Sequence, residues 1–125
     1  MSKVLLIEDE EMLLNSYSDF LEAKGFETLK ASDGYKGLDM MEKHKDEISL
    51  IVLDLMMPVL DGLEVLRMKE ENKEKYTNAP VLVLTNMTSE KVIKDCFDLG
   101  TVSYLIKNEM TMESLVKEVN KILDK

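Results

Sequence analysis

A short apolar run that ends in an acid and is followed by turn residues constrains this chain more than any other feature. Residues 50–53 read Leu-Ile-Val-Leu, Asp54 follows, and Pro58 and Gly62 then interrupt regular structure. Four apolar residues bounded by turn signals predict a strand buried on both faces, as in a parallel sheet. Ligands of open α/β sheets bind outside the carboxyl ends of the strands, which makes Asp54 a candidate site residue. An acid here can equally cap the next helix, and spacing alone leaves both interpretations open.

The rest of the 125-residue chain alternates strand-like and helix-like segments. Strands are predicted at residues 4–7, 26–31, 50–53, 81–84 and 102–106. The four segments between them and the segment after the last strand have apolar residues at helical spacing. Helix ends are predicted at Gly25 and Gly100, and helix starts at Thr88 or Ser89 and at Thr111.

This alternation predicts a doubly wound α/β fold. Five strands and five helices, (βα)5, favour a parallel sheet with helices on both faces. Segment 26–31 alternates apolar and polar residues as an edge strand does, which suits the flavodoxin-like strand order 2-1-3-4-5. No linker or repeat interrupts the pattern, so we expect residues 1–125 to form a single domain.

Composition excludes several classes of protein. The single cysteine, Cys96, cannot form an internal disulfide, and no cysteine–histidine spacing suggests zinc. The formal net charge of −9 argues against direct binding to nucleic acid. No apolar stretch approaches the roughly 20 residues of a membrane span. These features predict a cytoplasmic protein without membrane insertion, whose partners are proteins or small cations.

Polar residues follow four of the predicted strands. They are Glu8 and Asp9, Asp54, Thr85 and Lys107. Carboxyl ends of parallel strands meet at one edge of a sheet, so we expect these side chains to converge. Like charges about 4 Å apart repel by on the order of 4 kcal/mol at an effective dielectric near 20, which favours a bound cation, and oxygen ligands suit magnesium. A lysine and a hydroxyl nearby suggest a phosphoryl group, with Asp54 as the nucleophile.

With these residues in place, the whole chain resembles the receiver domain of bacterial two-component response regulators. The matching residues are Glu8 and Asp9, the segment Val52-Leu53-Asp54-Leu55-Met56-Met57-Pro58 with Asp61-Gly62, Thr85, Tyr104 and Lys107. The resemblance implies a single receiver domain over residues 1–125 that works as a phosphorylation-activated signalling switch. It implies no enzyme beyond catalysis of the domain's own phosphorylation and dephosphorylation.

The resemblance also implies roles for the acids. Asp54 would accept a phosphoryl group from the phosphohistidine of a sensor histidine kinase or phosphotransfer protein, or from a small acyl-phosphate donor. Asp9, Asp54 and the backbone carbonyl of Met56 would bind Mg²⁺, and Glu8 would hold the metal mainly through water.

A second set of implied roles concerns the switch. Thr85 and Lys107 would contact the phosphoryl oxygens, and Tyr104 would swing inward when Thr85 moves toward the phosphate. The changed surface of the fourth helix, fifth strand and fifth helix would regulate a downstream protein or output domain.

The chain departs from the family pattern at four positions. Asn108 follows Lys107 where proline is usual, which puts a cis peptide after the lysine in doubt, and Asn86 follows Thr85 where a small residue is usual. Met56 and Met87 lie two positions beyond Asp54 and Thr85 and offer no group to orient an attacking water. We therefore expect slow hydrolysis of the phosphorylated form.

Other functions have less support. A phosphohydrolase of the haloacid dehalogenase type needs a second acid at the position of Met56. A dinucleotide or flavin site lacks a glycine-rich loop after the first strand. The remaining alternative is a receiver-like protein-binding module that acts without phosphorylation.

Overall fold

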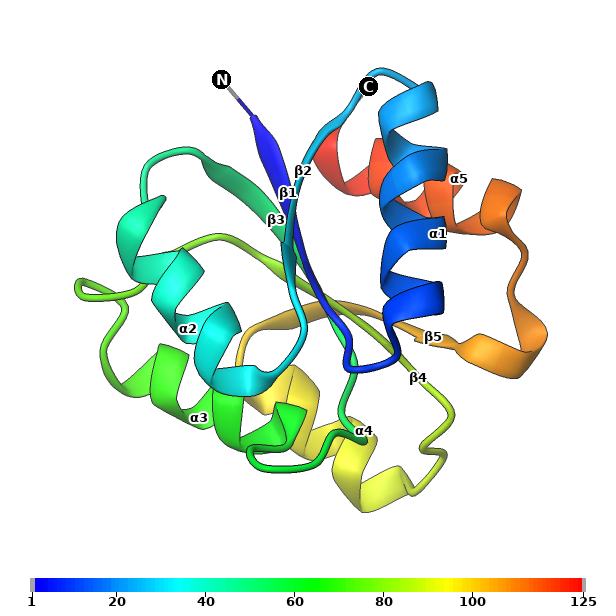
Figure 1. Cartoon of the computed structure of the whole chain (residues 1–125). Coiled ribbons are helices and arrows are strands. Elements are labelled where there is room, and N and C mark those ends of the chain that lie inside the picture. The colour runs from blue at the N-terminus through cyan, green and yellow to red at the C-terminus, as the bar shows by residue number, and fades with distance from the viewer. Residues whose placement is uncertain (1, 125) are drawn as a thin grey trace.

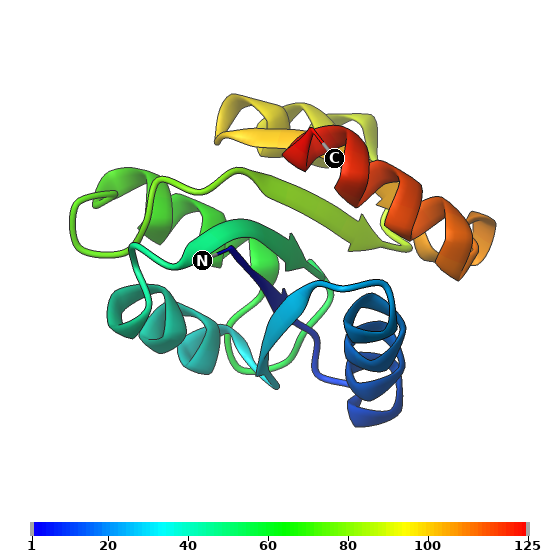
Figure 2. The same ribbon diagram turned by 90° about the horizontal axis from the view of Figure 1, so that it is seen from above.

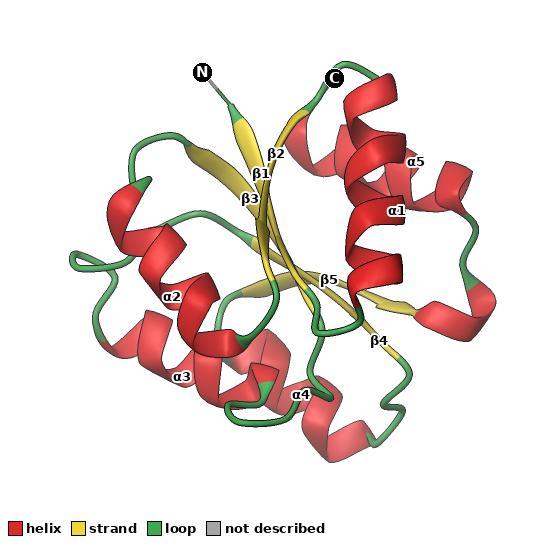
Figure 3. Ribbon diagram, viewed as in Figure 1, coloured by secondary structure: helices red, strands yellow, loops and turns green. Residues whose placement is uncertain are grey.

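The computed structural model describes residues 2–124. Strands and helices alternate along them in the order β1 (Lys3–Ile7), α1 (Glu11–Ala23), β2 (Glu27–Ala31), α2 (Gly34–Lys43), β3 (Ile48–Leu53), α3 (Gly62–Glu71), β4 (Val81–Thr85), α4 (Glu90–Asp98), β5 (Thr101–Ile106) and α5 (Met112–Leu123). A 3₁₀ turn, η1 (Lys107–Glu109), separates β5 from α5. The predicted alternation is confirmed (Figure 3).

The five strands form one parallel sheet in the order β2-β1-β3-β4-β5 (Figure 1). This is the predicted doubly wound order. Strands β1, β3 and β4 lie inside the sheet and are almost entirely buried, whereas β2 is an edge strand with partly exposed residues. The register places Leu53 beside Ile7 on one side and beside Val83 on the other.

Helices cover both faces of the sheet (Figure 2). One core layer packs α1 and α5 against the sheet, and the other packs α2, α3 and α4 against the opposite face. Alternate residues of each central strand point to opposite faces, so Leu5 and Leu6 belong to different layers. Burial on both faces explains why these strands are continuously apolar.

Local sequence signals set the helix boundaries. Side-chain oxygens of Asp33, Asp61, Ser89 and Thr111 accept hydrogen bonds from backbone N–H groups in the first turns of α2, α3, α4 and α5. Gly25 and Gly100 have φ values of 95° and 91° just after α1 and α4, a conformation that favours glycine. The predicted starts and stops are confirmed, with Ser89 rather than Thr88 as the cap. Within residues 2–124, no helix combines the length and the apolar character that crossing a membrane requires.

Candidate functional site

The central strands bring the acidic residues to one edge of the sheet. Glu8 and Asp9 follow β1, and Asp54 follows β3. The backbone N–H of Asp54 donates to the carbonyl of Ile7 (3.1 Å), so the β1–β3 pairing continues one step past the strands. Parallel pairing thereby places Asp54 beside Glu8, although 46 positions separate them in the sequence.

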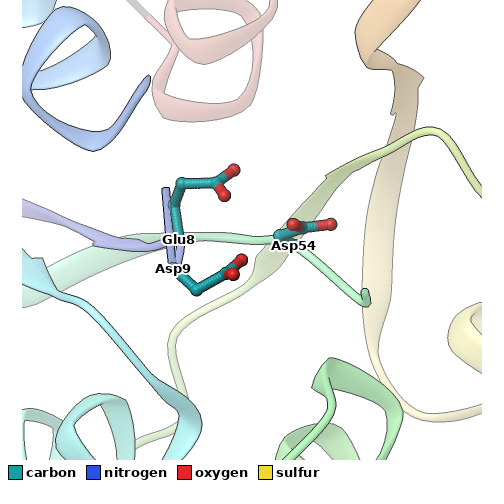
Figure 4. A group of neighbouring side chains, drawn as sticks. All are labelled: Glu8, Asp9 and Asp54. Atoms are coloured by element: carbon teal, nitrogen blue, oxygen red, sulfur yellow. The ribbon is translucent and has the colours of Figure 1, made fainter. Parts of the chain in front are cut away.

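Three carboxylates meet at this edge. One oxygen from each of Glu8, Asp9 and Asp54 lies within 4.8 Å of the others (Figure 4). Glu8 and Asp54 are only 3% and 4% exposed, whereas Asp9 is half-buried. Water screens buried like charges poorly, so the cluster is unfavourable without compensating cations.

Lys107 supplies one positive charge. Its Nζ lies 2.6 Å from Glu8 Oε1 and 3.0 Å from Asp54 Oδ2. Burial lowers the pKa of the Lys107 ammonium, but the contacts with Glu8 and Asp54 raise it more, so the net shift is upward. Burial also raises the pKa of the Glu8 carboxyl, and the contact with Lys107 offsets only part of that shift.

The two buried carboxylates are held in the same way. Glu8 Oε2 accepts a hydrogen bond from the backbone N–H of Glu10 (3.1 Å), and Asp54 Oδ1 accepts one from the N–H of Met56 (3.1 Å). The second oxygen of each acid faces Lys107. These contacts fix the carboxylates in orientation before any ligand binds.

The donor set fits a divalent cation that prefers oxygen. Glu8 Oε1 is fully buried and makes no well-directed hydrogen bond, although the ammonium is close. A buried oxygen with unused acceptor capacity costs free energy unless a cation or donor satisfies it. One ammonium also leaves the three carboxylates with an excess of negative charge. Residues Glu8, Asp9 and Asp54 therefore can hold a metal ion, and Mg²⁺ suits such a set.

Thr85 reaches the same edge from β4. It is fully buried and pairs with Ile106, the residue before Lys107. Its Oγ1 accepts a hydrogen bond from the Met87 N–H (3.4 Å), and in the described part of the chain it makes none to the acids. The structure thus places Thr85 next to the end of β5, one residue before Lys107. The Thr85 hydroxyl contacts the backbone of the loop that follows β4.

Tyr104 contacts that loop from β5. Its hydroxyl donates a hydrogen bond to the carbonyl of Met87 (2.7 Å), and its ring lies 6.5 Å from that of Phe97 between centroids. Burial raises the pKa of Tyr104 to about 12, so the hydroxyl remains a donor at neutral pH. Met87 therefore connects Thr85 to Tyr104 through its backbone, a role that its apolar side chain did not predict.

A second contact between loops joins the two unusual asparagines. The backbone N–H of Asn108 donates to Asn86 Oδ1 (2.9 Å). The sequence marked each residue as a departure from the family pattern, but no spacing signal connects residues 22 positions apart. The described residues contain no cis peptide bond, so the bond between Lys107 and Asn108 is trans.

Comparisons with known proteins find similar sequences among bacterial regulators. The chain is 36% identical over 107 residues to the alkaline phosphatase synthesis transcriptional regulatory protein PhoP of Bacillus subtilis, covering 84% of this chain and 42% of PhoP. It is 32% identical over 82 residues to the polar-differentiation response regulator DivK of Brucella anthropi, covering 66% of this chain and 64% of DivK. The chain thus spans less than two thirds of either relative.

Solved structures and a family model extend the match over nearly the whole chain. The chemotaxis protein CheY4 of Vibrio cholerae superposes with a TM-score of 0.85 at 28% identity, covering 98% of both chains. The family model of the response regulator receiver domain matches residues 4–120. The chain therefore belongs to the response regulator receiver domain family, a family of signalling domains.

Proposed function

We propose that this domain is a phosphorylation-activated switch, that residues 1–125 form one receiver domain, and that Asp54 is its phosphoacceptor. One observation carries the proposal: the buried Asp54 carboxylate lies 3.0 Å from Lys107 Nζ and within 4.8 Å of two further acids. A nucleophile, a cation that can pair with phosphoryl oxygens and a candidate metal site thus lie side by side at one edge of the sheet.

The transfer is a single displacement at phosphorus. A carboxylate oxygen of Asp54 forms a bond to phosphorus while the bond to the donor breaks, and the donor leaves with the electron pair. The donor is a phosphohistidine of a sensor kinase or phosphotransfer protein, or a small acyl phosphate. Lys107 neutralises negative charge on the phosphoryl oxygens and keeps its proton throughout, which its raised pKa favours.

Magnesium is the proposed cofactor. Asp9, Asp54 and the backbone carbonyl of Met56 would hold it directly, and Glu8 mainly through water. When bound, the ion supplies charge neutralisation between the carboxylates and the phosphoryl oxygens. Glu8 and Asp54 are already oriented by backbone N–H groups, so binding requires little rearrangement of these two acids.

A pocket beside Lys107 is the proposed docking region for a protein donor. An open pocket of about 590 Å³ lies between the start of α1 and the segment after β5. Its lining includes Leu13, Tyr17, Asn86, Lys107 and Met110. None of the three acids lines this pocket, so it would seat the donor protein beside Lys107 rather than at Asp54 itself. As part of the same proposal, the domain works in the cytoplasm.

The loop after β4, which contains Met87, would transmit the effect of phosphorylation to the surface of the domain. A phosphoryl group adds about −1.5 to −2 charges and three acceptor oxygens. The Thr85 hydroxyl can donate to one of these oxygens if it gives up its contact with the Met87 N–H and turns toward the phosphoryl group. Because Met87 also binds the Tyr104 hydroxyl, this motion alters the position of the ring. The surface of α4, β5 and α5, where Phe97 and Val102 are 46% and 52% exposed, would then present a changed face to a downstream protein or output domain.

Intact mass after incubation with a small acyl-phosphate donor tests the proposal. The wild type should gain one base-labile phosphoryl group that requires magnesium, and Asp54→Asn should gain none. Asp61→Asn is the matched control, because Asp61 caps α3 without belonging to the acidic cluster, and asparagine also caps well. An unmodified wild type that nevertheless binds magnesium would favour the alternative, a protein-binding module that acts without phosphorylation.

A further inference from the structure

A hydrogen bond joins the residues that follow the two proposed phosphoryl-binding side chains. Asn86 follows Thr85, Asn108 follows Lys107, and the Asn108 N–H donates to Asn86 Oδ1 at 2.9 Å. The regular β4–β5 pairing ends with Thr85 beside Ile106. The Asn86 side chain thus extends the contact between these strands into the loops, where backbone pairing has stopped.

The backbone after β5 explains why an acceptor is useful here. Lys107–Glu109 form a 3₁₀ turn, and N–H groups at the start of a helical turn have no acceptor within it. Neither the turn nor the strand pairing supplies a partner for the Asn108 N–H. Asn86 provides that partner from a loop 22 positions earlier.

The contact requires an acceptor side chain at position 86 and a residue other than proline at position 108. Proline at position 108 would have no N–H to donate, and a small apolar residue at position 86 would have no oxygen to accept. Because the donor is a backbone N–H, the amide oxygen of Asn86 must be the atom that faces it. The two departures from the family pattern are therefore the two halves of one contact.

We propose that Asn86 is a positioning residue for Lys107. By accepting from the Asn108 N–H, it fixes the start of the turn that carries Lys107, so the ammonium stays between Glu8 Oε1 (2.6 Å) and Asp54 Oδ2 (3.0 Å). The same hydrogen bond joins the segment that follows Thr85 to the segment that follows β5, so the positions of Thr85 and Lys107 relative to the phosphoryl group are coupled. This inference rests on the proposed phosphorylation of Asp54.

Phosphorylation kinetics test the positioning role. Asn86→Ala removes the acceptor, Asn108→Pro removes the donor, and Asn108→Ala changes the side chain while keeping the N–H. With a small acyl-phosphate donor and magnesium, Asn86→Ala and Asn108→Pro should each lower the maximal rate by roughly two- to tenfold, the range for one hydrogen bond in contact with water. The donor concentration at half-maximal rate should change little, because Lys107 acts on charge that develops during transfer, and Asn108→Ala should match the wild type.

The double variant identifies the bond itself as the cause. Asn86→Ala with Asn108→Pro should be no slower than the slower single variant, because each substitution removes the same contact. Multiplied effects, or a wild-type rate in Asn86→Ala, would overturn the positioning role. Failure of the wild type to become phosphorylated would instead overturn the proposed function.

Amide hydrogen exchange provides a readout that does not depend on phosphorylation or on the proline variant. The Asn108 amide of the wild type should exchange more slowly than in Asn86→Ala, by roughly two- to tenfold. Amides within β4, such as that of Val83, should be unaffected. Equal exchange at Asn108 in both proteins would mean that the bond does not restrain the loop, and the inference would be wrong.

Discussion

Val59 adopts a backbone conformation that is costly for its residue type. It lies in the loop between Asp54 and α3 with φ of 72°, and its side chain is 81% exposed. A β-branched residue in the left-handed region is strained by about 1–2 kcal/mol, and this exposed side chain gains little burial in return. The strain lies in the loop that follows Asp54, the proposed phosphoacceptor.

Replacing Val59 should therefore stabilise the protein. Asparagine tolerates positive φ, so Val59→Asn should raise the free energy of unfolding by about 1 kcal/mol, measured by urea denaturation. Val102→Asn is the control, because Val102 is also exposed but lies in β5, where a β-branched residue suits the extended backbone. Val102→Asn should be neutral or destabilising; a loss of stability in Val59→Asn would contradict the argument from strain.

Asp9 adds charge to an already unfavourable cluster. Without magnesium, Asp9→Asn should stabilise the protein by on the order of 1–2 kcal/mol, because a carboxylate within 4.8 Å of Glu8 and Asp54 oxygens is neutralised. The same variant should lose most of the rise in Tm that magnesium gives the wild type. Thermal unfolding in chelator and in magnesium measures both effects.

The control is Asp39→Asn, which removes an exposed partner of Lys43 and should keep the magnesium response. An undiminished magnesium response in Asp9→Asn would exclude Asp9 as a ligand.

Met56 bears on the lifetime of the phosphorylated form. Its side chain is exposed beside Asp54 and has no group that orients water for attack on an acyl phosphate. We expect the phosphorylated wild type to persist well beyond seconds in magnesium, and Met56→Asn, which introduces an amide, to hydrolyse several-fold faster. Decay followed by intact mass gives both rates. A wild-type half-life of a few seconds would disprove this expectation.

At the scale of elements, the start of α3 packs directly on the end of β3. A Cβ added to Gly62 would lie 2.3 Å from the carbonyl oxygen of Asp54 and 2.7 Å from Leu55 Cα, both backbone atoms. Only glycine permits this approach, which places the start of α3 against the backbone of Asp54, the proposed phosphoacceptor.

Gly62→Ala should therefore disturb both stability and the site. Overpacking against backbone should cost about 3 kcal/mol in unfolding free energy and lower the rate of Asp54 phosphorylation. Gly37→Ala is the comparison, because its added Cβ would meet mainly the end of the Ile7 side chain, and alanine improves helix propensity in α2. Gly37→Ala should cost less in stability and little in phosphorylation rate; equal effects of the two variants would remove the special role of Gly62.

The strands and their parallel order were predictable from the sequence, whereas several contacts between loops were not. Continuous apolar strands such as residues 81–84 identified the sheet, and parallel topology then required their polar ends to converge, which located the acids and Lys107. The contacts of Met87 and the bond between Asn86 and Asn108 were not predictable. They depend on how two loops approach across the sheet edge, and neither composition nor periodicity encodes that approach.

At the scale of the whole molecule, Cys96 reports on folding. It is fully buried on α4, in the core layer that α2, α3 and α4 form on the sheet. Burial raises the pKa of its thiol from 9.0 to about 11. Since only unfolding exposes the thiol, alkylation of Cys96 should follow the same denaturant transition as far-UV circular dichroism.

The raised pKa of Cys96 also predicts how stability depends on pH. In the unfolded chain the thiol loses its proton near pH 9.0, whereas in the folded protein it keeps the proton up to about pH 11. The contribution of the protonated Cys96 thiol to the free energy of unfolding is therefore fully present below pH 9.0 and is lost as the pH rises toward 11. Lysines and tyrosines titrate in the same range, so the test compares the wild type with Cys96→Ala, which keeps all of those groups. In urea unfolding at about pH 8 and about pH 10.5, the stability advantage of the wild type should shrink at the higher pH. An advantage that stays constant would mean that the folded protein does not hold the thiol proton more tightly than the unfolded chain does.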